Sequence, residues 1–314
     1  MDDGKAVKLD EFHRRKFQQE LLEIYKEFDR ICRVCGISYA MSGGTLLGAV
    51  RHKGFIPWDD DMDADMLRGD YETFCRVVDD VIDHERFFFQ NAANDPGYRW
   101  VYGKLRRKNT EYIRVGQGVL TQKTGLCIDI FPLDAAYDDW RQPIANHGCR
   151  ILRKFLWAPV GAHEGTSVTE RLFFQALSAI PRDWSMAWHH KLAVWARTGQ
   201  PKRYLISHNT GDIWGRKYER AWFEKTVEMT FEDCKFLAPQ GYDGVLRVNY
   251  GDYMALPPLK DRHGNSAAAC LRFSDGEDCA RTVERYNEGK TVGVGVRRFC
   301  FGMKGFLKWM TNIF

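Results

Sequence analysis

The stretch Trp58-Asp59-Asp60-Asp61-Met62-Asp63-Ala64-Asp65 places five acidic residues within seven consecutive positions. On an extended backbone alternate side chains point to one face, so Asp59, Asp61, Asp63 and Asp65 would project together. Carboxylates this close repel one another and raise each other's pKa unless a cation lies among them. A hard divalent cation such as Mg²⁺ prefers carboxylate oxygens. The stretch therefore predicts a metal site rather than a solvated acidic loop.

The residues before the acidic stretch predict a phosphate-binding turn. Ser42-Gly43-Gly44-Thr45 is typical of a tight turn that opens a short helix, here over residues 46–50. Glycines let the backbone N–H groups approach phosphate oxygens closely, and a helix N-terminus favours anions. A loop carrying Arg51 and His52 then leads to the acidic stretch, whose second half, 61–67, alternates as a strand does.

A third acidic position comes later in the chain. The segment 125–134 is an apolar strand with Asp129 in its middle. A lone buried carboxylate is costly unless it is paired or bound to a ligand. We therefore favour a ligand-binding role for Asp129 over a structural one.

The first 138 residues alternate helix and strand patterns. Apolar positions recur at helical spacing over 9–35, and Gly36 predicts the end of that helix. A second helix is expected at 71–83, and further strands at 37–41, 87–91, 98–106 and 111–115. Alternation would place Lys104 and Arg106 on one face of their strand and Arg107 on the other. Lys104 and Arg106 are candidate phosphate contacts, the alternative being an exposed basic strand face.

Composition limits the class of protein. The chain has 314 residues, of which 44% are hydrophobic and 14% aromatic, which favours a folded protein over a disordered one. Its formal charge of +4 does not call for nucleic acid. The nine scattered cysteines are typical of reduced thiols, and Cys32-x-x-Cys35 fits two thiols on a helix better than a zinc site. The first residues lack the pattern of a secretory signal, and we expect an intracellular protein.

The rest of the chain differs in residue composition. Residues 139–225 are rich in Trp, Arg and Lys at helical spacing. Near the C-terminus a basic amphipathic helix is expected, with Phe299, Met303, Phe306, Met310 and Ile313 on one face and Arg297, Arg298, Lys304 and Lys308 around it. It could bind an anionic membrane surface or dock on the protein's own core. We expect a catalytic core at 1–138, a helical lobe returning to the core at 139–265, and a C-terminal segment at 266–314.

The segment 41–63 as a whole resembles the signature of the LicD family of phosphocholine transferases, whose animal relatives are fukutin and the fukutin-related protein. Two further stretches are similar: 128–134, and 250–254 together with Pro257, Pro258 and His263. The resemblance covers about residues 20–135 well and 240–265 in patches.

The resemblance implies an α+β, nucleotidyltransferase-like fold with a mixed sheet flanked by helices, here with a helical insertion or second lobe. In such a fold a Gly-Gly or Gly-Ser turn precedes an acid-apolar-acid strand. Those places are taken by Gly43 and Gly44, by Asp61 and Asp63, and by Asp129 as the third acid, with Asp59 as an additional carboxylate. Asp60 and Asp65 are left as more remote or solvent-facing charges. Tyr250, Asp252 and His263 match the late motif as substrate contacts.

Residue chemistry and resemblance together predict an enzyme. We expect transfer of a phosphorylated small alcohol, phosphocholine first, from a CDP-activated donor to a hydroxyl of a cell-surface glycan such as lipopolysaccharide or teichoic acid, with release of CMP. Mg²⁺ or Mn²⁺ would be held by Asp59, Asp61, Asp63 and Asp129, or Asp129 would accept the proton of the attacking hydroxyl. The expected phosphate or nucleotide contacts are Gly43, Gly44, Thr45, Arg51, His52, Lys104 and Arg106.

Two alternatives stay open. One is a nucleotidyltransferase that moves NMP from an NTP to a small acceptor. The other is a non-catalytic member of the family. The expected location is cytoplasmic, peripheral at the inner face of the membrane if the C-terminal helix binds there, and no nucleic-acid partner is expected.

Overall fold

A mixed β-sheet forms the centre of the protein in a computed structural model that describes residues 7, 9–197, 202–208, 216–264 and 268–279. Five strands follow the order β1-β2-β6-β4-β3, and β7 and β8 extend the sheet beyond β6. Their bounds are β1 Ala40–Met41, β2 Asp63–Leu67, β3 Phe87–Gln90, β4 Gly103–Arg107, β6 Cys127–Ala136, β7 Tyr204–Ile206 and β8 Lys217–Glu219. Only β2 and β6 pair in parallel among these described strands. The mixed sheet with its helices confirms the predicted α+β class.

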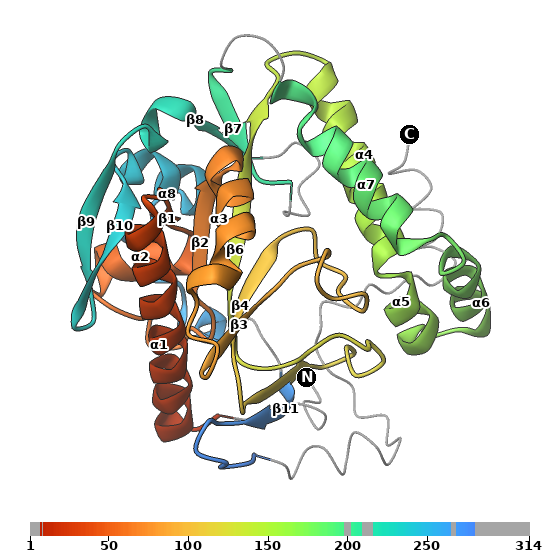
Figure 1. The fold of residues 1–314 in the computed structure, drawn as a ribbon, viewed down its shortest axis with the longest axis horizontal. Helices are drawn as coiled ribbons and strands as arrows, with labels where there is room; N and C mark the ends of the chain where they lie inside the picture. The colour runs from red at the N-terminus through yellow and green to blue at the C-terminus, as the bar shows by residue number, and fades with distance from the viewer. Residues whose placement is uncertain (1–6, 8, 198–201, 209–215, 265–267, 280–314) are drawn as a thin grey trace.

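Two helices pack on the sheet and contribute buried side chains to its core. These are α1, Glu11–Cys35, and α3, Arg68–Val81, which contact each other and the strands β2, β4 and β6 (Figure 1). Helix α1 begins at Asp10, whose side chain accepts from the His13 N–H, and ends at Gly36 in the left-handed conformation, with φ 64°. The buried side chains of α1 have the spacing of an amphipathic helix: Phe17, Leu21, Ile24, Tyr25, Phe28 and Ile31.

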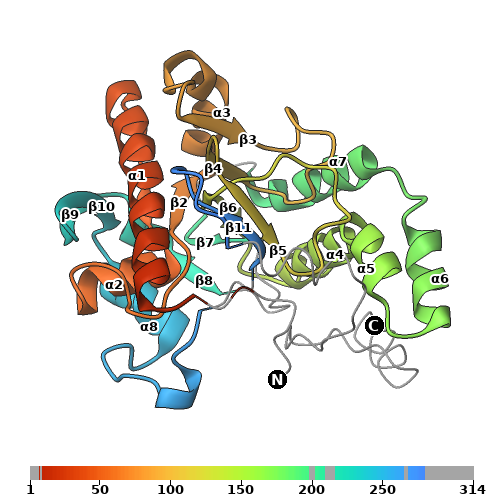
Figure 2. The same ribbon diagram turned by 90° about the horizontal axis from the view of Figure 1, so that it is seen from below.

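A helical lobe lies beyond β6 and β7. It consists of α4 Arg141–Leu156, α5 Ala158–Glu164, α6 Val168–Leu177 and α7 Arg182–Ala193, followed by the 3₁₀ turn η1 Trp195–Arg197. Helix α4 packs along α7, and α5 packs along α6. Figures 1 and 2 place these helices on one side of the molecule, away from α1. They form the helical insertion expected after residue 138.

The predicted helical character of 139–225 is wrong for its last part. Strands β7 and β8 and the 3₁₀ turn η2, Arg220–Phe223, lie there instead. Strand β7 pairs with the second half of β6, with Asp134 opposite Ile206. The reason is that β6 runs on past its neighbour β2 and offers free backbone groups for pairing.

Two small sheets join later residues to the first part of the chain. Strands β9, Thr226–Phe231, and β10, Cys234–Pro239, form a hairpin against β1 and α2. Strand β11, Ala268–Arg272, pairs with β5, Glu111–Arg114. The boundaries expected at 138/139 and 265/266 therefore do not separate independent sheets.

The remaining described elements lie near the expected motifs. Helix α2, Gly43–Arg51, contacts α8, Tyr242–Tyr250, and a 3₁₀ turn η3, Leu259–Asp261, follows. Within the described ranges, every helix is too short or too polar to cross a membrane. The basic amphipathic helix expected at 297–313 lies outside the described residues.

Candidate metal and phosphate site

The Gly-Gly turn lies directly against two acidic side chains. Helix α2 starts at Gly43, three residues earlier than predicted, and Gly43 has φ 51°. A Cβ on Gly43 would lie 3.2 Å from Asp63 Oδ2, and one on Gly44 only 2.5 Å from Asp59 Oδ2. The backbone is tied to the same place, because the Ser42 N–H donates to the Asp63 carbonyl over 3.1 Å. These two positions therefore require glycine, and they bring the first amides of α2 to the carboxylates.

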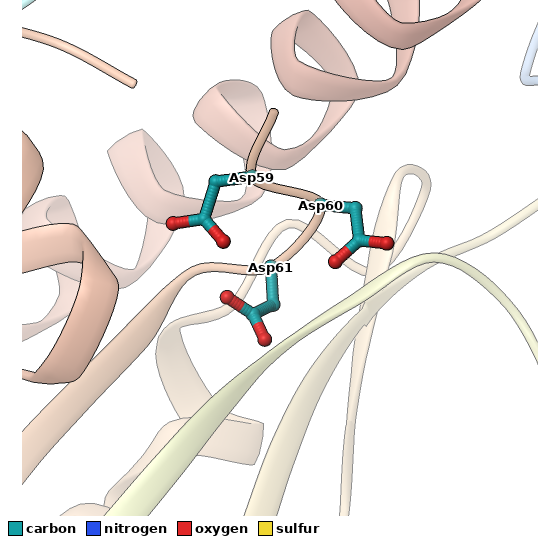
Figure 3. Close-up of side chains that lie close together, drawn as sticks. All are labelled: Asp59, Asp60 and Asp61. Carbon is teal, nitrogen blue, oxygen red and sulfur yellow. The ribbon is translucent and has the colours of Figure 1, made fainter. Parts of the chain in front are cut away.

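The first part of the acidic stretch, residues 59–61, forms a loop, here called the acidic loop, and the strand predicted over 61–67 begins two residues later than expected. Strand β2 begins at Asp63 rather than Asp61, so Asp59, Asp60 and Asp61 do not alternate between two faces. Instead each of these three consecutive residues offers a carboxylate oxygen within 4.8 Å of the others. Figure 3 shows the three side chains close together. The loop can gather neighbouring side chains because it is free of the strand's period of two.

Asp60 lies closer to the expected metal site than predicted. It is half-buried and belongs to the group of three, with its carboxylate against Gly264. Asp65 is 5% exposed and accepts from Ser42 Oγ over 2.7 Å. It lies outside the group of three, as expected, and it is buried rather than solvent-facing.

Asp129 stands beside Asp63 because β2 and β6 pair in parallel with these two residues in register. On the other side of β6, Lys104 of β4 is opposite Asp129. The buried Lys104 ammonium donates to Asp129 Oδ1, and Tyr102 Oη donates to Asp129 Oδ2 over 3.1 Å. Asp129 thus carries the compensating cation that its position in an apolar strand requires.

The pKa values of the clustered acids and of Asp129 are shifted in opposite directions. Burial, and then the charges of Asp61 and Asp60, raise the pKa of Asp59 to about 8. Burial, and then Asp60, raise the pKa of Asp61 to about 6. Burial and the charges of Asp61 and Asp129 raise the pKa of Asp63 well above its usual 3.8. Although burial opposes it, the positive charges of Lys104 and Arg114 hold the pKa of Asp129 below its usual value.

This donor set fits a hard divalent cation. It offers carboxylate oxygens from Asp59, Asp60 and Asp61. Asp63 is outside this group of three but is close enough to feel the charges of Asp61 and Asp59, and a cation would relieve the repulsion among these acids. Asp129 is ionised near neutral pH and hydrogen-bonded on both oxygens, so it suits the role of a fixed base or of a further ligand.

The predicted phosphate contacts separate into two groups. Thr45 lies at the site, where its hydroxyl accepts from the Asp63 N–H over 2.9 Å. Lys104 also lies there, paired with Asp129. Arg106 is 3% exposed, and its guanidinium donates to Gln90 Oε1 and to the Gly125 carbonyl. Its donors are therefore used within the core.

Arg51 and His52 hold the later motif rather than the acidic loop. Arg51 Nη1 donates to the carbonyls of Tyr253 and Ala255 over 2.8 and 3.3 Å, and its Nε donates to His52 Nε2 over 3.0 Å. Burial and the charge of Arg51 lower the pKa of His52, which keeps its ring neutral. The ring also lies edge-on to Trp58, with centroids 6.3 Å apart.

The late motif reaches the site through one side chain. A Cβ on Gly43 would lie 3.9 Å from the Tyr250 hydroxyl. Burial, followed by the charges of Asp63, Asp59 and Asp61, raises the pKa of Tyr250. Asp252 and His263 are exposed, and His263 Nδ1 lies 3.1 Å from the Gly264 carbonyl, next to Asp60.

Two residues of the site were missing from the prediction. Tyr102 could have been found, since it alternates with Lys104 and so shares its strand face. Arg114 ends β5, and its approach to Asp129 depends on a strand that pairs only with β11. No local sequence signal indicates that approach.

The fold and the site together define an α+β protein with carboxylates gathered at a Gly-Gly helix start. Residues 36–147 match the family model described as the LicD/FKTN/FKRP nucleotidyltransferase domain. This part of the chain is therefore similar to the LicD family domain, in agreement with the sequence resemblance.

Curated relatives agree with this assignment. The chain is 29% identical over 260 residues to the lipopolysaccharide cholinephosphotransferase LicD of Haemophilus influenzae, covering 79% of this chain and 94% of that protein. It is 29% identical over 104 residues to the human ribitol 5-phosphate transferase FKRP, covering 31% of this chain and 21% of that protein. An uncharacterized protein of Rickettsia typhi is 38% identical over 58 residues, 18% of this chain and 19% of that protein. The two named relatives are both transferases of phosphorylated alcohols.

Proposed function

We propose that this protein transfers a phosphorylated small alcohol, phosphocholine in the first instance, from a CDP-activated donor to a hydroxyl of a cell-surface glycan, releasing CMP. The observation that carries the proposal is the contact of Gly43 and Gly44 with Asp63 and Asp59, beside the parallel pair of Asp63 and Asp129. Free helix amides and clustered carboxylates in one place suit a phosphate-bearing substrate and a divalent cation.

Mg²⁺ or Mn²⁺ is the cofactor that we propose, held by Asp59, Asp61 and Asp63, with Asp60 as a ligand added by the loop geometry. Of the two roles expected for Asp129, we propose that of the base. When bound, such a cation neutralises charge on the phosphate groups of the donor. The first amides of α2, at Gly43 and Gly44, would bind phosphate oxygens.

Asp129 is the proposed general base. Lys104 and Tyr102 fix the orientation of its carboxylate and keep it ionised. In transfer, the acceptor hydroxyl attacks the phosphorus that carries the alcohol, and its proton passes to Asp129 as the bond to the CMP oxygen breaks. The choice of choline follows the relative with which this chain aligns over most of its length.

The test is an assay of CMP release. The purified protein is incubated with CDP-choline, CDP-ribitol and CDP-ethanolamine, each with Mg²⁺ or Mn²⁺ and each with and without extracted surface glycan. The proposal expects CMP release that depends on metal and glycan, with choline preferred. Pyrophosphate release from NTPs, without CMP release from any CDP-alcohol, would replace it by the nucleotidyltransferase alternative.

A further inference from the structure

Arg114 lies at the edge of the site on an element that is separate from the central sheet. It is the last residue of β5 and stands opposite Ala268 of β11. Its side chain lines a small pocket together with Trp100, Lys104 and Cys127. Lys104 and Cys127 come from β4 and β6, so the pocket adjoins the strand that carries Asp129.

The guanidinium of Arg114 is half-buried, and within the described ranges it has neither an ion pair nor a hydrogen bond. Its recorded neighbour is the ring of Tyr112, with Cζ 5.9 Å from the ring centroid. The other cations of this region are engaged: Lys104 pairs with Asp129, and Arg107 Nε lies 2.7 Å from Glu20 Oε2. Arg106 donates to core acceptors.

Arg114 nevertheless lies close to the buried pair of the site, because the Lys104 that lines its pocket is the partner of Asp129. Within the described residues the Arg114 guanidinium forms no ion pair with Asp129 itself. Its five N–H donors stay available at a place where Asp129 is already satisfied by Lys104 and Tyr102.

A partly desolvated guanidinium without a partner is costly, and its planar fork matches phosphate oxygens. We propose that Arg114 binds a phosphate group of the substrate in the pocket that it lines with Lys104. The inference rests on the proposed function for the identity of the donor, and it assigns to Arg114 a substrate-binding role that Arg106 had been expected to fill.

The experiment measures binding without turnover. Calorimetric titrations with CDP, CMP and cytidine, each in Mg²⁺, are carried out on the wild type, Arg114→Gln, Arg114→Lys and the control Arg76→Gln. Arg76 is exposed on α3 and contacts Thr73. We expect Arg114→Gln to weaken CDP binding by about ten- to a hundredfold, the range for a hydrogen-bonded charge pair, with cytidine binding and thermal unfolding unchanged. The CDP affinity of Arg114→Lys should lie between those of the wild type and Arg114→Gln, and the CDP affinity of Arg76→Gln should equal that of the wild type.

The outcomes separate this inference from the proposed function. Equal CDP affinity in wild type and Arg114→Gln, equal weakening of CDP and cytidine, or a wild type that does not bind CDP would each overturn the role of Arg114. If Arg114→Gln selectively weakens CDP binding while no CDP-alcohol yields CMP, the inference stands and the proposed function falls. If CMP is released and Arg114→Gln retains the wild-type donor KM and CDP affinity, the function stands and the inference falls.

Discussion

Asp59→Asn removes one titratable carboxyl group from the acidic loop at nearly constant side-chain size, and its effect on stability should depend on pH. Burial and the neighbouring carboxylates raise the pKa of Asp59 from 3.8 to about 8. In the metal-free folded protein this group therefore keeps a proton that the unfolded chain releases above pH 3.8. Stability from this group is fully present below that pH and is lost as the pH rises towards 8.

The magnitude follows from proton linkage. One extra proton on the folded state lowers the free energy of unfolding by about 1.4 kcal/mol per pH unit, or about 3 kcal/mol between pH 5 and pH 7. Asp59 and Asp61 titrate together, so Asp61 binds part of this proton when Asp59 is ionised. We therefore expect the decrease in the free energy of unfolding between pH 5 and pH 7 to be about 1 to 3 kcal/mol smaller in Asp59→Asn than in the wild type.

Urea unfolding in EDTA at pH 5, 6, 7 and 8 measures this difference, with Asp80→Asn on the exposed surface of α3 as the matched control. Excess Mg²⁺ at pH 7 should then stabilise the wild type in proportion to the logarithm of its concentration, and Asp59→Asn less. Identical pH dependence in wild type and Asp59→Asn would refute the electrostatic account of the loop.

Three further substitutions test the site and its scaffold. Asp63→Asn should lower CMP release more than about a hundredfold while leaving the circular dichroism spectrum unchanged, because it removes a proposed ligand next to Asp59; a folded variant with full activity contradicts the assignment. Gly44→Ala places a Cβ 2.5 Å from Asp59 Oδ2, so Mg²⁺ affinity by calorimetry should fall about ten- to a hundredfold; unchanged affinity would exclude Asp59 as a ligand. Arg68→Met leaves the buried Asp134 without its bidentate partner at 2.7 Å, which should cost about 3 to 5 kcal/mol in urea unfolding. The double variant Arg68→Met/Asp134→Leu should recover much of that loss, and no recovery would mean that packing rather than charge is responsible.

The elements with strong local signals were predicted well. Helix α1 was found from its apolar spacing and from Gly36, which ends the helix in the left-handed conformation. Strand β6 was found from its apolar run, with Asp129 correctly recognised as a buried acid that needs a partner. In both, side-chain periodicity and one special residue carry the information.

Elements that depend on distant pairing were not predicted. Strand β7 has three residues and exists because the second half of β6 offers it a pairing edge. The start of the strand at Asp61 was predicted wrongly for a related reason. The alternation of residues 59–65 resembles a strand, yet the pairing of β2 with β6 begins only at Asp63. The local sequence pattern indicates which residues could form a strand, but the neighbouring strand with which they pair is brought there only by the tertiary fold.

By itself the sequence determined that a Gly-Gly turn and an acidic stretch must lie together with a buried acid, because close carboxylates and a lone Asp in an apolar strand both need compensation. Tertiary structure alone decided how that compensation is shared. Strand register places Lys104 against Asp129, while α2 approaches Asp59 and Asp63 through glycines. The small sheet of β5 and β11 then places Arg114 at a pocket that it shares with Lys104. Charges that are equivalent in the sequence differ in function here because burial and distance, which set their interactions, exist only in the folded chain.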